Sequence, residues 1–242
     1  MYRLSDDEIQ KNREEFIKIL SNAIDKREGA NAEALIKKLD KNEFFTAPAS
    51  TRYHNSFKGG LCEHCLNVYY NAMSIAKNKH ILAIHEQFPI VDSEGKETGE
   101  YEDRVVEGYI EADSIAIVSL LHDMSKIGYY RVAYKNKKVY CEHGTKRDKG
   151  GRFDWVAIEG YETVPQEERF LYGSHEETAE FMVRQFIPLT YDESIAILHH
   201  HFGMSFDSIK DIGTVANLYN RYQLASLLHV ADTVSTYIDE KY

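Results

Sequence analysis

The residues Ile115–Leu121 are nearly all apolar, and His122-Asp123 follows them without a break. A helix that is apolar on every side has to be buried inside a core. Its end then places an imidazole and a carboxylate in the interior, where an unpaired charge is costly and needs a partner. We therefore expect the fold to be built around a buried helix that ends in two potential metal ligands.

Segments with helical periodicity lie on both sides of this helix. Ser5 and Glu8 form a capping-box pattern at the start of the first segment, and Gly59-Gly60 marks a turn before a long one. Apolar residues recur at helical spacing over about 31–39, 61–79, 175–186, 192–201 and 215–238. These patterns predict an all-α fold, with residues 1–48 forming N-terminal helices that pack on a core domain of residues 49–242.

Two segments lack helical periodicity. Residues 129–164 contain short runs of aromatic and β-branched residues around turns rich in lysine and glycine, which predicts a small β-hairpin insertion. Residues 90–111 are acidic, contain glycine and show no period, so we interpret them as a surface loop. The expected architecture is thus one helical domain that carries a single β-hairpin.

The composition of the 242 residues excludes several classes of protein. No stretch approaches the roughly 18 apolar residues that a membrane span needs, and the first residues lack the profile of a secretory signal. Three cysteines rule out a disulfide scaffold and are typical of a reducing compartment, so we expect a cytoplasmic protein without a membrane partner. The net charge of −10 argues against a surface that coats nucleic acid broadly.

The chain has eleven histidines, and several of them lie in or near the expected helices together with carboxylates. A single buried histidine is most often an ordinary core residue with a hydrogen-bond partner, so the pattern matters more than any one position. The candidate ligands are His64, His122, Asp123, His175, Asp232 and a residue of the His199-His200-His201 cluster. Imidazole and carboxylate groups together suit Fe, Mn, Zn or Ni better than Ca. A carboxylate next to a ligating histidine can also bridge two such ions at one helix end.

Three segments carry a resemblance to a known family. Residues 120–128 read LLHDMSKIG, residues 54–64 read HNSFKGGLCEH, and residues 230–235 read VADTVS. In this order they are similar to the motifs of the HD-domain phosphohydrolase superfamily, whose members are helical, metal-dependent phosphatases and phosphodiesterases. The second segment is especially similar to that of bacterial HD-type 3′–5′ exoribonucleases. The resemblance implies an HD-domain helical bundle with metal-ligand roles for His64, His122, Asp123 and Asp232.

Further histidines resemble the second-metal ligands of two-metal HD proteins, such as the HD-GYP phosphodiesterases and the HD-type diadenosine tetraphosphate hydrolases. The segments GSHEE at 173–177 and AILHH at 196–200 carry this likeness. It implies that His175 and His200 bind a second metal, with His199 as the alternative and His201 as the least favoured of the three. The expected cofactor is a pair of divalent transition metals, Fe, Mn, Ni, Co or Zn.

The resemblance also implies a reaction, the hydrolysis of a phosphate ester or phosphodiester in a small phosphorylated or nucleotide-like substrate by metal-activated water. Asp123 and Lys126 would be the catalytic residues. Lys126 lies four residues after His122 on the same helical face, so it would bind an anionic group of the substrate. Arg52 and His54 lie just before the first ligand helix and would also bind the substrate. Two alternatives remain: 3′–5′ exonuclease action on short single-stranded RNA or DNA, and a catalytically degenerate module that binds a nucleotide.

Two further features have an ordinary interpretation beside a functional one. Eight basic residues against two acidic ones lie between Arg131 and Arg152, which indicates either a solvated hairpin edge or a flap that attracts phosphates. Cys62 and Cys65 have the C-x-x-C spacing of a metal or redox site, but no second ligand pair accompanies them. We interpret them as small buried side chains that flank His64.

Overall fold

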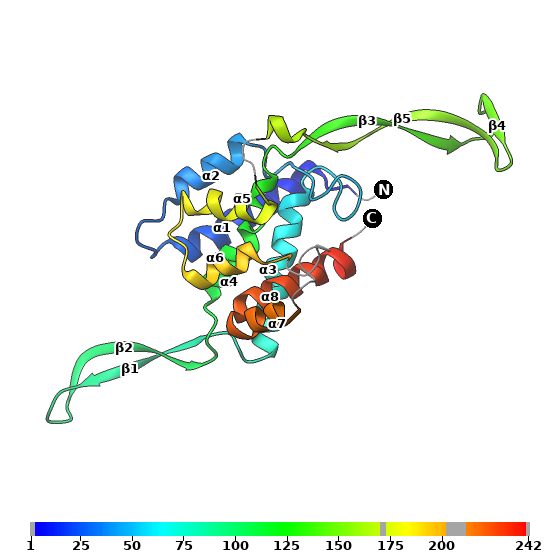
Figure 1. Ribbon diagram of the computed structural model, residues 1–242. Coiled ribbons are helices and arrows are strands. Elements are labelled where there is room, and N and C mark those ends of the chain that lie inside the picture. The colour runs from blue at the N-terminus through cyan, green and yellow to red at the C-terminus, as the bar shows by residue number, and fades with distance from the viewer. Residues whose placement is uncertain (1–2, 170–172, 202–211, 241–242) are drawn as a thin grey trace.

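The computed structural model describes residues 3–169, 173–201 and 212–240 and combines a helical body with two antiparallel sheets (Figure 1). The helices of the body are α1 (Asp6–Ile24), α2 (Ala32–Lys41), α3 (Gly60–Asn78), α4 (Ala112–Leu121), α5 (His175–Arg184), α6 (Tyr191–Leu198), α7 (Ile212–Arg221) and α8 (Gln223–Val234). The strands are β1 (Ile84–Val91), β2 (Glu97–Glu107), β3 (Tyr130–Tyr140), β4 (Lys146–Asp148) and β5 (Gly151–Thr163). The expectation of an all-α fold with one small hairpin is therefore wrong, because the described chain is of mixed helix and sheet composition.

The α4 helix occupies the centre of the body, as its apolar sequence predicts. It packs against α1, α3, α6 and α8, and every residue from Ile115 to Leu121 is buried. The helix ends at Leu121, and a short 3₁₀ turn over Met124–Lys126 follows. The polar pair His122-Asp123 thus lies between two helical segments inside the core.

The N-terminal helix α1 confirms the capping-box prediction. The Ser5 side chain accepts a hydrogen bond from the Glu8 backbone, and the Glu8 carboxylate accepts one from the Ser5 backbone. Phe16 is fully buried and its ring packs against those of Phe44 and Phe45. This aromatic cluster helps to hold α1 and the segment after α2 on the body. Among the described helices, we find none with the combination of length and apolar character that crossing a bilayer requires.

The α3 helix begins where two glycines were expected to form a turn. Gly59 has a φ of 84°, a left-handed conformation that glycine adopts at no steric cost. At Gly60 an added Cβ atom would lie 2.0 Å from the Asn55 carbonyl oxygen, so a larger residue would displace the preceding loop. The two glycines therefore let residues 50–58 fold closely over the first turn of α3, next to His64.

The C-terminal segment corrects a second expectation. The apolar period over 215–238 predicts one helix, but α7 ends at Arg221, α8 starts at Gln223, and a π-helical turn covers Ser235–Asp239. Tyr222 has a non-helical backbone, with φ −118° and ψ 81°. A break of one residue leaves the apolar period almost unchanged, so periodicity alone does not detect it.

Strands β1 and β2 form a two-stranded ribbon that we call the acidic arm, residues 84–107. It contains eight Asp or Glu residues against two Lys or Arg. The interpretation of residues 90–111 as a loop is therefore wrong over most of that range. Both faces of this ribbon are largely exposed, so its sequence has no need to alternate between apolar and polar residues. Without that alternation a strand resembles a loop.

The second sheet, which we call the basic arm, spans residues 130–163 and has the strand order β3-β5-β4. The insertion expected over about 129–164 is confirmed in position, but β3 and β5 are 11 and 13 residues long and pair along their whole length. The arm holds eight Lys or Arg residues against five Asp or Glu. The two arms project from opposite sides of the helical body (Figure 1).

Candidate metal centre

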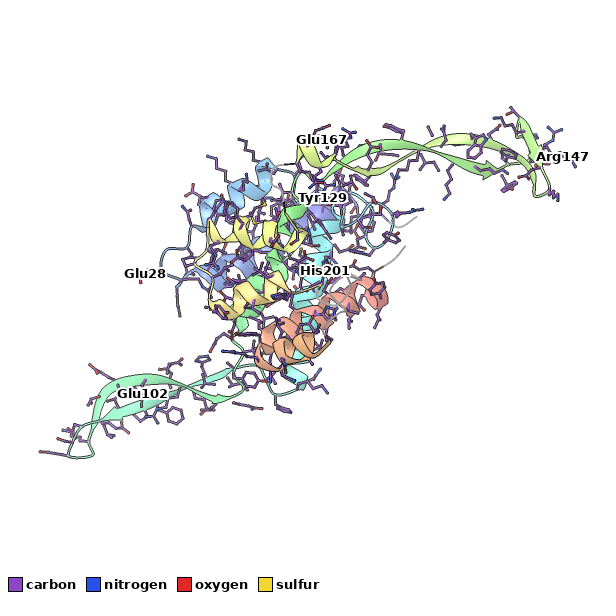
Figure 2. The ribbon with its side chains drawn as sticks, viewed as in Figure 1. Glu28, Glu102, Tyr129, Arg147, Glu167 and His201 are labelled. Carbon is purple, nitrogen blue, oxygen red and sulfur yellow. The ribbon has the colours of Figure 1, made fainter. Side chains whose placement is uncertain are left out.

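The candidate ligands come from five separate segments that meet inside the helical body. His64 lies on α3, His122 and Asp123 follow α4, and His175 is the first residue of α5. His200 follows α6, and Asp232 lies on α8. Of these six side chains, all but His175 are buried. His201, beside them, lies within the body between the two arms (Figure 2).

Asp123 is the centre of the arrangement. Its Oδ2 atom lies 3.6 Å from Nε2 of both His64 and His122, while its Oδ1 atom lies 2.5 Å from His175 Nε2 and 4.0 Å from His200 Nε2. The two oxygens of one buried carboxylate thus face two different sets of histidines. Asp123 is therefore the residue that the two sets of histidines share.

The first set is fully buried, and we call His64, His122 and Asp123 the buried group. Asp232 adjoins it, with Oδ1 3.2 Å from His64 Nε2. Two atoms that each lie roughly 2.1 Å from one metal ion are roughly 3.0–3.4 Å apart at tetrahedral or octahedral angles. The separations of 3.2 and 3.6 Å in this group are close to that spacing.

Glu240 joins the buried group although the sequence did not indicate it. Its Oε1 atom lies 2.7 Å from His64 Nδ1, so the ring is held on the side away from Asp232. Burial alone would lower the pKa of His64, but Glu240 and Asp232 outweigh it and raise that pKa to about 10. Glu240 belongs to a short polar run after α8, where no periodicity distinguishes it from a surface residue.

The tautomers of His122 and His200 follow from their backbone contacts. Their Nδ1 atoms lie 2.8 and 2.7 Å from the carbonyl oxygens of Ser119 and Ile197, and because a carbonyl only accepts, each Nδ1 must donate. Each Nε2 is then left with a lone pair, buried and without a hydrogen-bond partner among the described residues. Burial lowers the pKa of His122 to about 4 and that of His200 well below its usual value. Two neutral imidazoles with unpartnered nitrogens are in the state that a metal ligand requires.

The second set, which we call the open group, consists of His175, His200 and His201. One nitrogen from each ring lies within 4.8 Å of the others, and His175 and His201 are partly exposed. His201 was the least favoured of the three adjacent histidines, yet its Nε2 lies 3.3 Å from Asp232 Oδ2 and its Nδ1 3.2 Å from Glu176 Oε1. His199 ends α6 and is not part of this group within the described residues.

Neighbouring residues orient the open group. Ser125 Oγ lies 2.5 Å from His175 Nδ1, and the ring of His229 donates from Nδ1 to the His200 carbonyl oxygen at 2.6 Å. A hydrogen bond at the second ring nitrogen, as on His175, fixes the orientation of a metal-binding histidine, whereas the His229 contact holds the backbone at His200.

Lys126 is the cation nearest to Asp123. Its Nζ atom lies 2.5 Å from Asp123 Oδ2 in an ion pair, and its side chain is 11% exposed. Burial would lower the pKa of Lys126, but Asp123 outweighs it and raises that pKa. Burial would likewise raise the pKa of Asp123, whereas Lys126 and His122 hold it well below its usual range. Asp123 is therefore ionised and Lys126 charged at neutral pH.

The structure places two of the residues expected to bind the substrate, His54 and Arg52, in different surroundings. The His54 ring lies 4.9 Å from the His64 ring, and burial together with the nearby His64 lowers the pKa of His54 to about 3. Arg52 is exposed and its guanidinium lies 5.9 Å from the centre of the Tyr53 ring. Both Arg52 and Tyr53 line a cavity of about 860 Å³ at the base of the basic arm, and not at the ligands themselves. His54 thus contacts the buried group, and Arg52 faces a separate hollow.

The cysteines do not form a second site. Cys62 and Cys65 are buried in α3, and Cys141 is exposed on the basic arm. Burial raises the pKa of both α3 thiols, so they stay protonated and inert. The interpretation of the C-x-x-C spacing as small buried side chains is confirmed.

The donor atoms at these clusters are of the kind that bind metal ions. They are imidazole nitrogens and carboxylate oxygens, and the buried Nε2 atoms of His122 and His200 otherwise have no hydrogen-bond partner in the described structure. Comparison with family models, with curated protein sequences and with solved structures finds no match to this chain. What the structure shows is a set of clusters of histidine and carboxylate side chains that could hold metal ions.

Proposed function

We propose that this chain is a metal-dependent phosphohydrolase of the HD type, which cleaves a phosphate ester or phosphodiester of a nucleotide-like substrate. The observation that carries the proposal is Asp123, whose two oxygens face two separate groups of histidines. Two divalent ions held there would act as Lewis acids toward a phosphoryl oxygen and would lower the pKa of a water molecule. The motif order His64, His122-Asp123, Asp232 resembles that of the HD superfamily and supports the same activity.

The residues around the ligands have roles that suit this reaction. Lys126 would stabilise the negative charge that develops on the non-bridging phosphoryl oxygens, because its charge is fixed beside Asp123. The open group would be the side from which substrate approaches, because His175 and His201 are partly exposed there. A second, small cavity supports this direction of approach, since Ser125, Gly128 and His175 line it.

The test is a panel of substrates offered to the metal-loaded chain. Nucleoside mono-, di- and triphosphates, cyclic nucleotides, dinucleoside polyphosphates and short RNA would each be incubated with protein loaded with Mn, Fe, Co, Ni or Zn. We expect release of phosphate or nucleotide from at least one of them, and none from protein stripped of metal. Metal-loaded protein that binds a nucleotide but cleaves nothing would instead support a degenerate binding module.

A second candidate function, 3′–5′ exonuclease action on short single strands, is favoured by the cavity at the base of the basic arm. Arg52, Lys135 and Lys137 line this cavity, and Tyr53 offers an exposed aromatic ring on which a base could stack. Such a site would hold nucleotides beyond the one whose phosphate reacts. Cleavage of a short RNA at least as fast as that of mononucleotides, together with its loss in Arg52→Ala, would favour the nuclease.

A further inference from the structure

Both arms expose apolar side chains and open strand edges that a stable sheet usually covers. An isolated two-stranded ribbon is marginally stable, and stability normally requires a further strand or a packed face. On the acidic arm Tyr101 and Val105 are 60% and 47% exposed, and on the basic arm Tyr134 and Trp155 are 71% and 52% exposed. The described contacts of each arm are mostly within the arm itself. Each arm therefore has an apolar surface that lacks a partner within the described chain.

The arms also have open backbone edges. In the sheet order β3-β5-β4, the β3 strand pairs on one side only, and each strand of the acidic arm has a single neighbour. An open edge offers a row of amide and carbonyl groups that a strand from another chain can complete. Pairing through the edges would join two arms without any change in the helical body.

The charges on the two arms are complementary. On the acidic arm Glu94, Glu97 and Glu100 are exposed, and no ion pair holds them among the described residues. On the basic arm the same is true of Lys137, Lys146 and Lys149. Opposite charges of this kind steer two surfaces together and discriminate against the wrong partner. If both arms carried charge of the same sign, neither would attract the other.

The two arms of one chain lie on opposite sides of its body. Glu102 lies on the acidic arm and Arg147 near the tip of the basic arm, and the helical body lies between them (Figure 2). The complementary surfaces therefore cannot meet within one molecule. They can meet only between molecules.

We propose that the acidic arm of one copy docks along the basic arm of a second copy of this chain. The contact joins two different surfaces, so it either closes a symmetric assembly or continues from copy to copy. A second copy accounts for the exposed apolar residues, the open edges and the charges of both arms. A nucleic acid would account for the basic arm alone. The inference does not depend on the phosphohydrolase activity.

The experiment measures the mass of the full chain by light scattering and sedimentation, at low and at high salt. Between about 0.1 M and 1 M salt the Debye length falls from roughly 10 Å to 3 Å, so attraction between the arms should weaken. We expect a multiple of the chain mass of 28.0 kDa at low salt and a shift toward one chain at high salt. A single chain under both conditions would overturn the proposal.

Charge reversal then tests which surfaces meet. One variant carries Glu94→Lys, Glu97→Lys and Glu100→Lys, and a second carries Lys137→Glu, Lys146→Glu and Lys149→Glu. We expect each to be a single chain by itself. The first reversal leaves the acidic arm with five acidic and five basic residues and hence no net charge, and the second leaves the basic arm with eight acidic residues against five basic ones, so that both arms are negative. A matched control carries Glu14→Lys, Glu28→Lys and Glu33→Lys on exposed positions of the body and should assemble like the unchanged protein.

Mixing the two reversed variants is the decisive measurement. Arms of opposite charge are again available in the mixture, so we expect assembly to return. Circular dichroism and metal content would show that the helical body is intact in each variant. Assembly that survives either reversal, or that fails to return on mixing, would overturn the proposal. A single chain that assembles only on addition of a single-stranded oligonucleotide would assign the basic arm to nucleic acid instead.

Discussion

The buried group and the open group share Asp123, but they differ in their access to solvent. His64, His122 and Asp123 are each at most 1% exposed, whereas the side chains of His175 and His201 are 20% and 36% exposed. Structural metal sites are closed by protein ligands, and catalytic sites keep a position free for water or substrate. The difference suggests that an ion in the buried group would hold the fold together while one in the open group would meet the substrate.

Removal of Asp123 should have the largest effect, because it is the link between the two groups. We expect Asp123→Ala to lose both metals and to lower turnover by about 10³-fold or more, since several kcal/mol of charge stabilisation disappears. Elemental analysis and turnover of the best substrate in the panel measure this. His143→Ala, at an exposed histidine of the basic arm, is the matched control and should leave both unchanged. Retention of either metal in the Asp123 variant would show that the groups are independent.

Replacement of His200 should separate the two groups. His200→Ala is expected to lose the metal of the open group and most of the activity while the buried group keeps its own. His199→Ala should retain both metals, because His199 ends α6 and lies outside the group. His201→Ala should weaken the same metal, since His201 contacts Asp232 and Glu176. Two metals in the His200 variant and one in the His199 variant would reverse the assignment.

The helices of the body could be predicted because each buries at least one face. On α1 the buried residues Ile9, Phe16 and Leu20 recur at helical spacing, and on α4 burial on all sides produces a continuous apolar run. The acidic arm was missed because neither of its faces is buried, so its strands have no apolar period. The fold class was wrong for that reason.

The site could be predicted in part because its ligands stand in recognisable local contexts. His122-Asp123 follows a buried helix, and His64, His175 and Asp232 lie on helices that the periodicity identified. Glu240 and the place of His201 could not be found in this way. Both depend on how segments far apart in sequence meet: Glu240 contacts α3, and His201 contacts α8 and α5.

Lys126→Ala should leave both metals in place and lower turnover by about 10²-fold, a typical cost of removing one group that stabilises transition-state charge. The expected reason is that Lys126 acts on the substrate and contributes only an ion pair to Asp123. Turnover and elemental analysis of the same preparation test both statements. Loss of a metal in this variant would mean that Lys126 supports the ligands, and Lys126→Arg should then restore the metal but not the turnover.

A chelator should remove the two metals at different rates. The metal of the open group should leave first because His175 and His201 are reachable from solvent, and the metal of the buried group should leave more slowly because its ligands are enclosed. Metal content followed over time in excess chelator should show two phases. Activity is expected to fall with the first. A single phase for both metals would remove the distinction between the groups.

The smallest effect concerns the ion pair that anchors α6, the helix before His200. Arg27 Nη1 and Nη2 lie 2.6 and 2.8 Å from the two Glu193 oxygens, and the Ser114 hydroxyl donates to one of them at 2.7 Å. Burial alone would raise the pKa of Glu193, but the hydrogen bonds from Arg27, the Thr190 backbone and Ser114 together lower it. Asp113 also faces this pair, and burial raises its pKa.

Because the folded-state pKa of Glu193 is depressed, its contribution to stability is fully present above the unfolded value of about 4.3 and is lost as pH falls through the folded value. We expect Glu193→Gln to destabilise the protein by about 1–3 kcal/mol at neutral pH, a few degrees in Tm. The difference from the unchanged chain should stay constant down to about pH 4.3 and then shrink. Glu28→Gln, at an exposed position, is the control and should show no difference. The α6 helix leads into the open group and not into the buried group. In the Glu193 variant the chelator should therefore remove the metal of the open group faster, while the rate for the metal of the buried group stays unchanged. Equal acceleration of both phases would contradict this coupling.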